Sequence, residues 1–126
     1  MRRILPAASL ALLAACAGAP DRTLLAEGER QFQRCFACHS MDPAETGLSG
    51  PPLAGIVGAP AAAQAGFDYS PAMRKAAAEG LRWTGPNLDA FLADPAGLVP
   101  GTSMSPTGLH RGADRQALIA YLSMRK

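Results

Sequence analysis

Residues 35–39 constrain this chain more than any other part of its sequence. They read Cys35-Phe36-Ala37-Cys38-His39, which is the pattern C-x-x-C-H. Two thiols at this spacing can form thioether bonds to the two vinyl groups of one haem, and the histidine that follows can bind the iron as an axial ligand. The pattern therefore predicts a covalently attached c-type haem, and the fold must wrap a large apolar group.

Two other kinds of site also use a C-x-x-C pair. A zinc site would need at least one further cysteine or histidine, and only Cys16 and His110 remain in the chain. A thioredoxin-like redox pair would need a βαβ pattern around it, whereas the surrounding sequence has helical periodicity and is rich in glycine and proline. We favour haem attachment, and a redox or structural cysteine pair is the alternative.

The N-terminal residues 1–15 have the pattern of a signal peptide. A basic Met1-Arg2-Arg3 precedes an apolar segment of about a dozen residues, which is too short to span a bilayer as a stable helix. The segment ends in Leu13-Ala14-Ala15-Cys16, which resembles a bacterial lipobox. We therefore predict export, with Cys16 as an acylated N-terminus and residues 16–23 as a short tether to the periplasmic side of a membrane.

Cleavage by the ordinary signal peptidase at Ala15-Cys16-Ala17 is the alternative. It would release a soluble periplasmic protein. We favour the lipobox because it alone accounts for a lone cysteine at this position.

The charge of the chain argues against one class of partner. The arginines at positions 2 and 3 account for the formal net charge of +2, so the predicted mature chain is close to neutral. A nucleic-acid-binding protein would need a clustered basic face. We expect no nucleic-acid partner.

Helical periodicity predicts an all-α domain over residues 24–126. Thr23 is the expected N-cap of a first helix, on which Leu24, Gly28, Phe32 and Cys35 share one face. Three more helices are expected. The first, at 71–80, has Ser70 as N-cap and Pro71 as its first residue. The second, at 84–94, is capped by Thr84 or Asn87 and stopped by Pro95, and the last lies at 113–125. Long loops at 42–58 and 98–108 connect them, and no segment alternates as a strand would.

The chain resembles the class I cytochromes c of the mitochondrial and bacterial c2-like type. The resemblance extends from Leu24 to Leu122 and includes short motifs in the family's order. Besides C-x-x-C-H, these are Gly28-x-x-x-Phe32, Gly50-Pro51-x-Leu53, Gly66-Phe67-x-Tyr69-Ser70, Trp83, Phe91-Leu92-x-x-Pro95, Pro100-Gly101-Thr102-x-Met104 and Leu118-Ile119-Ala120-Tyr121-Leu122. It implies the class I cytochrome c fold, with four helices and long loops around one covalently attached haem c.

The resemblance also implies that Met104 is the second axial ligand of the iron, beside His39. A thioether stabilises ferrous iron and raises the reduction potential, and two strong axial ligands leave no open position for a substrate. The alternative is that Met104 is an ordinary loop or core methionine. His110, the competing histidine, is expected to lie on the surface.

Further roles follow from the same resemblance. The carbonyl of Pro51 is expected to accept from Nδ1 of His39 and to orient its ring. Tyr69 and Trp83 are expected to donate to a haem propionate, and their alternative role is that of core aromatics. Gly28 is expected to mark the close crossing of the first and last helices, opposite Tyr121.

The chain also departs from the family pattern. Gly58 is followed by Ala59, where many relatives have an arginine that can pair with a propionate. Pro106 replaces the aromatic that usually follows the axial methionine by two positions. The chain has only two lysines, so Arg34, Arg111 and His110 are expected to form a weak positive rim in place of a lysine ring.

These observations predict a membrane-tethered, monohaem one-electron carrier that is not an enzyme. Expected partners are respiratory or photosynthetic redox proteins, such as a cytochrome bc1 complex, a terminal oxidase, a reaction centre or a dehydrogenase. Two alternatives remain. The chain would be a fixed electron-transfer subunit of a periplasmic dehydrogenase or oxidase, or, less favoured, a haem-based enzyme or gas sensor.

Overall fold

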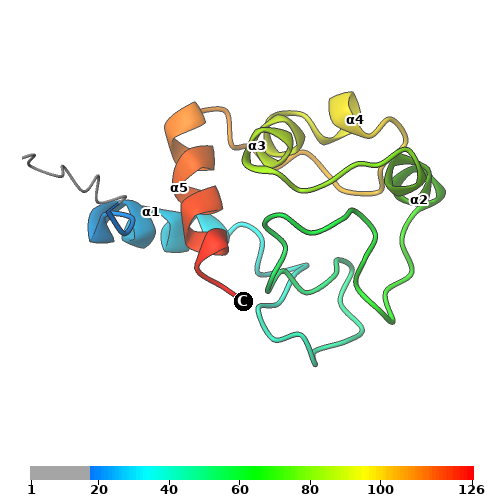
Figure 1. Cartoon of the computed structure of the whole chain (residues 1–126), viewed down its shortest axis with the longest axis horizontal. Coiled ribbons are helices and arrows are strands. Elements are labelled where there is room, and N and C mark those ends of the chain that lie inside the picture. The colour runs from blue at the N-terminus through cyan, green and yellow to red at the C-terminus, as the bar shows by residue number, and fades with distance from the viewer. Residues whose placement is uncertain (1–17) are drawn as a thin grey trace, which may run out of the picture.

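Five helices and long irregular connections make up the computed structural model, which describes residues 18–126. The helices are α1 (Arg22–Phe32), α2 (Pro71–Ala78), α3 (Gly85–Ala93), α4 (Pro95–Leu98) and α5 (Gly112–Ser123) (Figure 1). Within residues 18–126 there is no strand, only an isolated bridge between Pro60 and Arg82. The predicted all-α class is confirmed. The predicted signal peptide (1–15) and Cys16 lie outside the described residues.

The short helix α4 corrects the predicted number of four helices. Pro95 ends α3, as expected, but it also begins α4 as its first residue. Proline suits this position because the first amide of a helix has no partner inside the helix. Asp94, with an extended φ of −154°, separates the two helices.

The helix caps are mostly those that the sequence predicts, with one correction. Asp21, not Thr23, caps α1, and its carboxylate accepts from the amide of Thr23 at 3.1 Å. An anion is favourable there because the helix dipole is positive at its N-terminus. Ser70 and Thr84 cap α2 and α3 through their hydroxyl groups.

The crossing of α1 and α5 is the main contact between helices (Figure 1). A Cβ atom on Gly28 would lie only 2.1 Å from the carbonyl oxygen of Ala117 and 2.5 Å from Cβ of Tyr121. Glycine therefore lets the two backbones approach closely, which confirms the predicted crossing. Leu24, at the outer end of the predicted apolar face, is 37% exposed.

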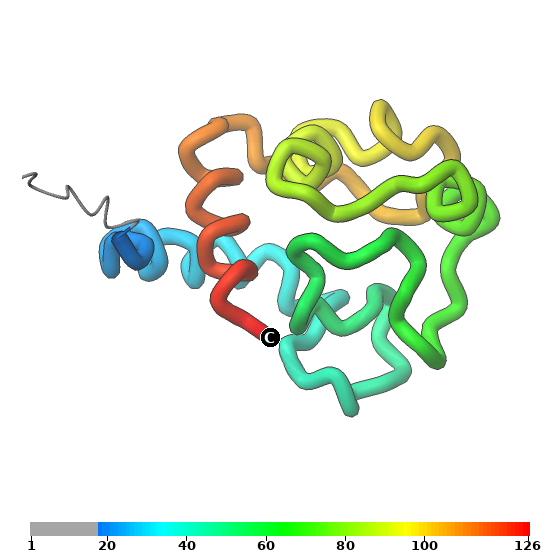
Figure 2. Tube along the Cα trace, in the orientation of Figure 1, coloured from blue at the N-terminus to red at the C-terminus, as the bar shows by residue number. Residues whose placement is uncertain are grey.

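The hydrophobic core joins this crossing to α3. The predicted inward residues Leu88, Phe91 and Leu92 are all buried, and the rings of Phe91 and Trp83 lie 4.9 Å apart. Figure 2 shows that the chain between α1 and α2, coloured cyan to green, runs as irregular loops below α3 and α4 in that view. None of the helices in residues 18–126 is long and apolar enough to cross a membrane.

Candidate haem site

The C-x-x-C-H segment is a compact turn at the end of α1. The amide of Cys35 donates to the carbonyl of Phe32 at 2.8 Å, and the amides of Cys38 and His39 both donate to the carbonyl of Cys35, at 3.0 and 2.9 Å. The first thiol is half-buried and the second is exposed. The end of α1 thus places both cysteines and the histidine on one turn.

A second loop packs against this turn. The amide of Gly50 donates to the carbonyl of Cys38, and the amide of Leu53 donates to the carbonyl of Ser40, both at 2.8 Å. Between these two bonds, Nδ1 of His39 lies 2.7 Å from the carbonyl oxygen of Pro51. This is the contact that the family resemblance implies, and it leaves Nε2 as the nitrogen free to bind a metal.

Gly50 determines how the His39 ring lies. A Cβ atom on Gly50 would come within 2.3 Å of Cε1, 2.5 Å of Nδ1 and 2.7 Å of Nε2 of that ring. Such distances are far below van der Waals contact, so the imidazole occupies the space that any other side chain would need. The ring is therefore held both by a hydrogen bond at its edge and by the backbone beside it.

Burial also affects the ionisation of the two half-buried groups in the turn. Burial lowers the pKa of His39, and the hydrogen bond to Pro51 opposes this only in part. The neutral imidazole, which is the form that binds metals, is thereby favoured. The pKa of the Cys35 thiol is raised, mainly by burial. The nearby Arg34 opposes this increase, and the Cys38 thiol adds to it.

Met104 lies in the loop that follows α4. The amide of Thr102 donates to the carbonyl of Val99 at 3.0 Å, and Gly101 takes a left-handed φ of +86° in the turn between them. The hydroxyl of Thr102 then accepts from the amide of Met104 at 3.3 Å. Met104 is half-buried and packs against the same core cluster as Cys35.

Tyr69 and Trp83 differ in how their polar groups are used. The Tyr69 hydroxyl accepts from the amide of Gln64 at 3.0 Å, so its own proton remains available to an acceptor. The Trp83 side chain is 5% exposed, and its indole N–H donates to no group among residues 18–126. No fully buried side-chain nitrogen or oxygen in that range lacks a partner, so this N–H reaches the surface, where a carboxylate can meet it.

The residues present therefore fit a covalently held haem. Two cysteines and an oriented neutral histidine share one turn, a methionine lies in a separate loop on the same core, and two aromatic side chains offer donors. Contacts within the chain join Cys35, Cys38, His39 and Pro51 directly. Met104, Tyr69 and Trp83 come from three other segments, and His110 is exposed, as predicted.

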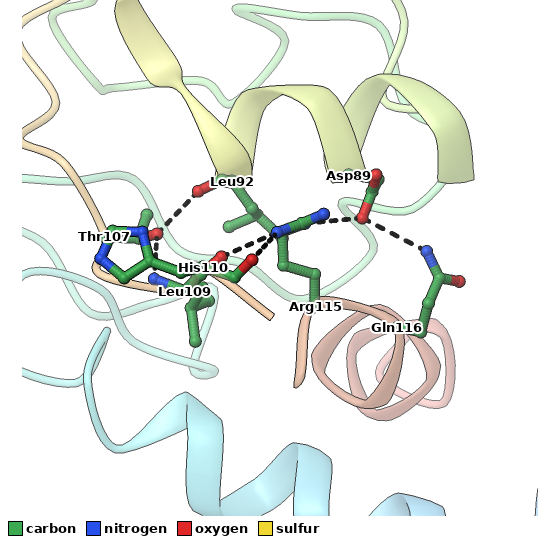
Figure 3. A network of polar contacts seen from close by, with 7 residues as sticks. All are labelled: Asp89, Leu92, Thr107, Leu109, His110, Arg115 and Gln116. Atoms are coloured by element: carbon green, nitrogen blue, oxygen red, sulfur yellow. Dashed lines mark hydrogen bonds and ion pairs between the residues drawn. The ribbon is translucent and has the colours of Figure 1, made fainter. Parts of the chain in front are cut away.

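A polar network around Arg115 was not foreseen from the sequence (Figure 3). It joins Arg115 on α5 to Asp89 on α3 and to carbonyls of the loop that follows Met104. Arg115 and Asp89 are 26 positions apart, and an isolated arginine or aspartate is usually a surface residue. Only the packing of α3 beside α5 brings them together.

Comparison with known proteins gives consistent results. The cytochrome c family model matches residues 25–126. Cytochrome c2 of Agrobacterium tumefaciens is 41% identical over 98 residues, which cover 78% of this chain and 88% of that protein. Cytochrome c2 iso-2 of Magnetospirillum fulvum is 43% identical over 97 residues, covering 77% and 97%. The structure of cytochrome cH from Methylobacterium extorquens superposes with a TM-score of 0.71 at 38% identity, covering 80% of this chain and 98% of that one.

Proposed function

This chain belongs to the cytochrome c family, and from that premise we propose that it is a membrane-tethered carrier of single electrons between redox proteins. Like its family, it binds haem c covalently and carries electrons. The haem iron supplies the chemistry by alternating between the ferric and ferrous states. The protein's part is to hold the ligands still and to keep other reactants away.

We assign residues 24–126 to the haem domain, with Cys35 and Cys38 as the attachment points and His39 and Met104 as the axial ligands. The observation that carries the assignment is the His39 ring, fixed between Gly50 and the Pro51 carbonyl on the same turn as both cysteines. A ring held in this way needs little rearrangement when the charge on a bound metal changes. Met104 is supported by its turn and by its contact with the core.

The remaining side chains are assigned to the rim of the haem. Tyr69 and Trp83 each have a polar hydrogen that no group among residues 18–126 accepts, and we assign both to the propionates. A carboxylate that is withdrawn from water needs such donors. With two protein ligands on the iron, no position is left for a substrate, which supports a carrier and not an enzyme.

The tether is proposed from the sequence around Cys16. The first helix begins at Arg22, so only the five residues 17–21 lie between it and the acylation site. Several acyl chains hold a protein at a membrane far more firmly than one, since each buried methylene contributes about 0.8 kcal/mol. The haem domain would thus stay close to the periplasmic face, where partners such as a cytochrome bc1 complex, a terminal oxidase, a reaction centre or a dehydrogenase lie.

Optical spectra of the holoprotein test the axial ligands. We expect a low-spin ferric spectrum with a methionine-to-iron charge-transfer band, no binding of carbon monoxide by the ferrous form, and loss of both properties in Met104→Ala. Met124→Ala is the matched control, because Met124 is 52% exposed and has no assigned role. Ready carbon monoxide binding by the unchanged protein would reject Met104 as ligand and favour an enzyme or a gas sensor.

The tether is tested by cell fractionation of the full chain. We expect the protein in the membrane fraction, released only by detergent, and Cys16→Ala either in the soluble periplasmic fraction or unprocessed. Soluble protein without the substitution would support ordinary signal-peptidase cleavage. A detergent extract in which the protein migrates as part of a large complex would instead support a fixed subunit.

A further inference from the structure

The loop that carries Met104 has few backbone hydrogen bonds of its own. Within residues 18–126, none of the amides of residues 103–109 donates to a backbone carbonyl. Two of them donate to side chains: Met104 to the hydroxyl of Thr102, and Leu109 to the hydroxyl of Thr107. Because its backbone makes so few bonds, the position of the loop depends on side chains, both its own threonines and side chains that bind it from other elements.

Arg115 makes the strongest of these external contacts. Its Nη1 atom donates to the carbonyl of Leu109 at 2.9 Å and to that of His110 at 3.0 Å. Its Nε atom donates to Oδ1 of Asp89 at 2.8 Å, and the two side chains are only 15% and 32% exposed. Figure 3 shows the guanidinium between the loop and α3. Hydrogen bonds to a charged donor are stronger than neutral ones, and guanidinium can serve three acceptors in fixed directions.

Asp89 holds Arg115 in this position. Its Oδ1 atom also accepts from Nε2 of Gln116 at 3.3 Å, so the carboxylate binds two neighbouring side chains of α5. Thr107 adds a bond on the same side, from its hydroxyl to the carbonyl of Leu92 at 2.7 Å. The segment 107–110 is thus attached to both α3 and α5, and it begins three residues after Met104.

We propose that Arg115, oriented by Asp89, is a positioning residue that keeps the Met104 thioether on the iron. The inference rests on the proposed role of Met104 as a ligand. Without Arg115 the carbonyls of Leu109 and His110 lose their shared donor. The loop then moves more freely about Thr102, and Met104 leaves the iron more often, which opens the site to small ligands.

The rate of cyanide binding to the ferric holoprotein tests this, because cyanide can bind only when Met104 has left. We expect Arg115→Lys and Asp89→Asn to bind cyanide roughly tenfold faster than the unchanged protein, with a weaker charge-transfer band. Lys cannot reproduce the three directed bonds, and Asn keeps the shape of Asp89 without its charge. Thr107→Val is a further variant that weakens the same attachment while leaving the ion pair intact.

Two controls separate positioning from general stability. Lys75→Gln removes a cation from the exposed Lys75–Glu79 ion pair on α2, and Ile119→Val weakens the packing of α5. Both should keep the cyanide rate of the unchanged protein, after correction for any change in the denaturant midpoint. If the Arg115 and Asp89 variants were no faster than Ile119→Val at equal stability, the inference would be wrong.

The Met104→Ala variant distinguishes this failure from that of the proposed function. If Met104→Ala binds cyanide faster than the unchanged protein while Arg115→Lys does not, only the inference about Arg115 is wrong. If Met104→Ala binds cyanide no faster than the unchanged protein, the ligand assignment falls as well. In the double variant, Arg115→Lys should add nothing to the rate of Met104→Ala, since its effect passes through Met104.

Discussion

The helix crossing and the haem loops of this protein are held in different ways. Where α1 crosses α5, each helix satisfies its own backbone and the two are brought together by one glycine and a shared apolar surface. In the loops, few contacts place each ligand: the His39 ring bonds to the carbonyl of Pro51 beside the backbone of Gly50, and the amide of Met104 donates to the hydroxyl of Thr102. The crossing therefore contributes mainly to stability, and the loops contribute mainly to the geometry of the site.

This difference predicts that substitutions in the two regions have separable effects. Many packing contacts together stabilise a pair of helices, so a defect in that packing lowers the free energy of unfolding of the whole domain. A loop bond is local, and its loss changes one ligand before it changes the fold. Stability and spectrum should then respond to different residues.

The largest effect is expected for Gly28→Ala in the crossing. Alanine is the better helix former, but its Cβ atom would overlap the Ala117 carbonyl, so we expect the free energy of unfolding of the holoprotein to fall by about 3 kcal/mol. Denaturant titration measures it. Gly85→Ala is the matched control, because no other element among residues 18–126 lies within 4 Å of a Cβ atom there, and it should gain at most about 1 kcal/mol in stability. Equal effects of the two substitutions would contradict the close crossing.

A smaller change in stability but a larger change in spectrum is expected for Gly50→Ala. The added methyl group must displace the His39 ring from the Pro51 carbonyl. We expect a loss of about 1–2 kcal/mol in stability, together with a weaker histidine-to-iron bond. The ferric spectrum and a redox titration measure the latter. An unchanged spectrum would show that Gly50 does not position the ligand.

The smallest effect is expected for the ionisation of Tyr69. Burial raises the pKa of its hydroxyl above the ordinary value of 10.0, and the hydrogen bond from Gln64 opposes this in part. The folded protein therefore holds this proton more tightly than the unfolded chain does, and stability falls as pH rises above about 10. Denaturant titrations between pH 9 and about 11.5 should show a shallower fall in Tyr69→Phe. The same slope in both proteins would contradict the shift.

The parts of the structure that could be predicted are those with a local or repeated signal. The caps Ser70 and Thr84, the inward face of α3 and the Gly28 crossing all follow from spacing, turn chemistry or motif order. The extra helix α4 was missed because a proline that ends one helix can also begin the next. Asp21 was missed as a cap because both Asp21 and Thr23 have suitable side chains.

The candidate site likewise contains residues that the sequence predicts and residues that it does not. Cys35, Cys38 and His39 are adjacent in sequence, so their turn was predictable, and Pro51 followed from the family resemblance. Arg115 and Asp89 could not be found, since neither residue has a local pattern and their contact depends on how α3 lies beside α5. Contacts between distant polar residues become visible only once the helices are placed.

The crossing at Gly28 also limits how this domain can be redesigned. The last turn of α1 leads straight into the first haem cysteine, through the bond from Cys35 to Phe32, and α1 takes its direction from α5. Four residues of helix, about 6 Å, separate Gly28 from Phe32 at the end of α1, so a small tilt of α1 at Gly28 would shift the turn that carries Cys35. A haem turn transplanted into another protein would need both helices to come with it, as one unit.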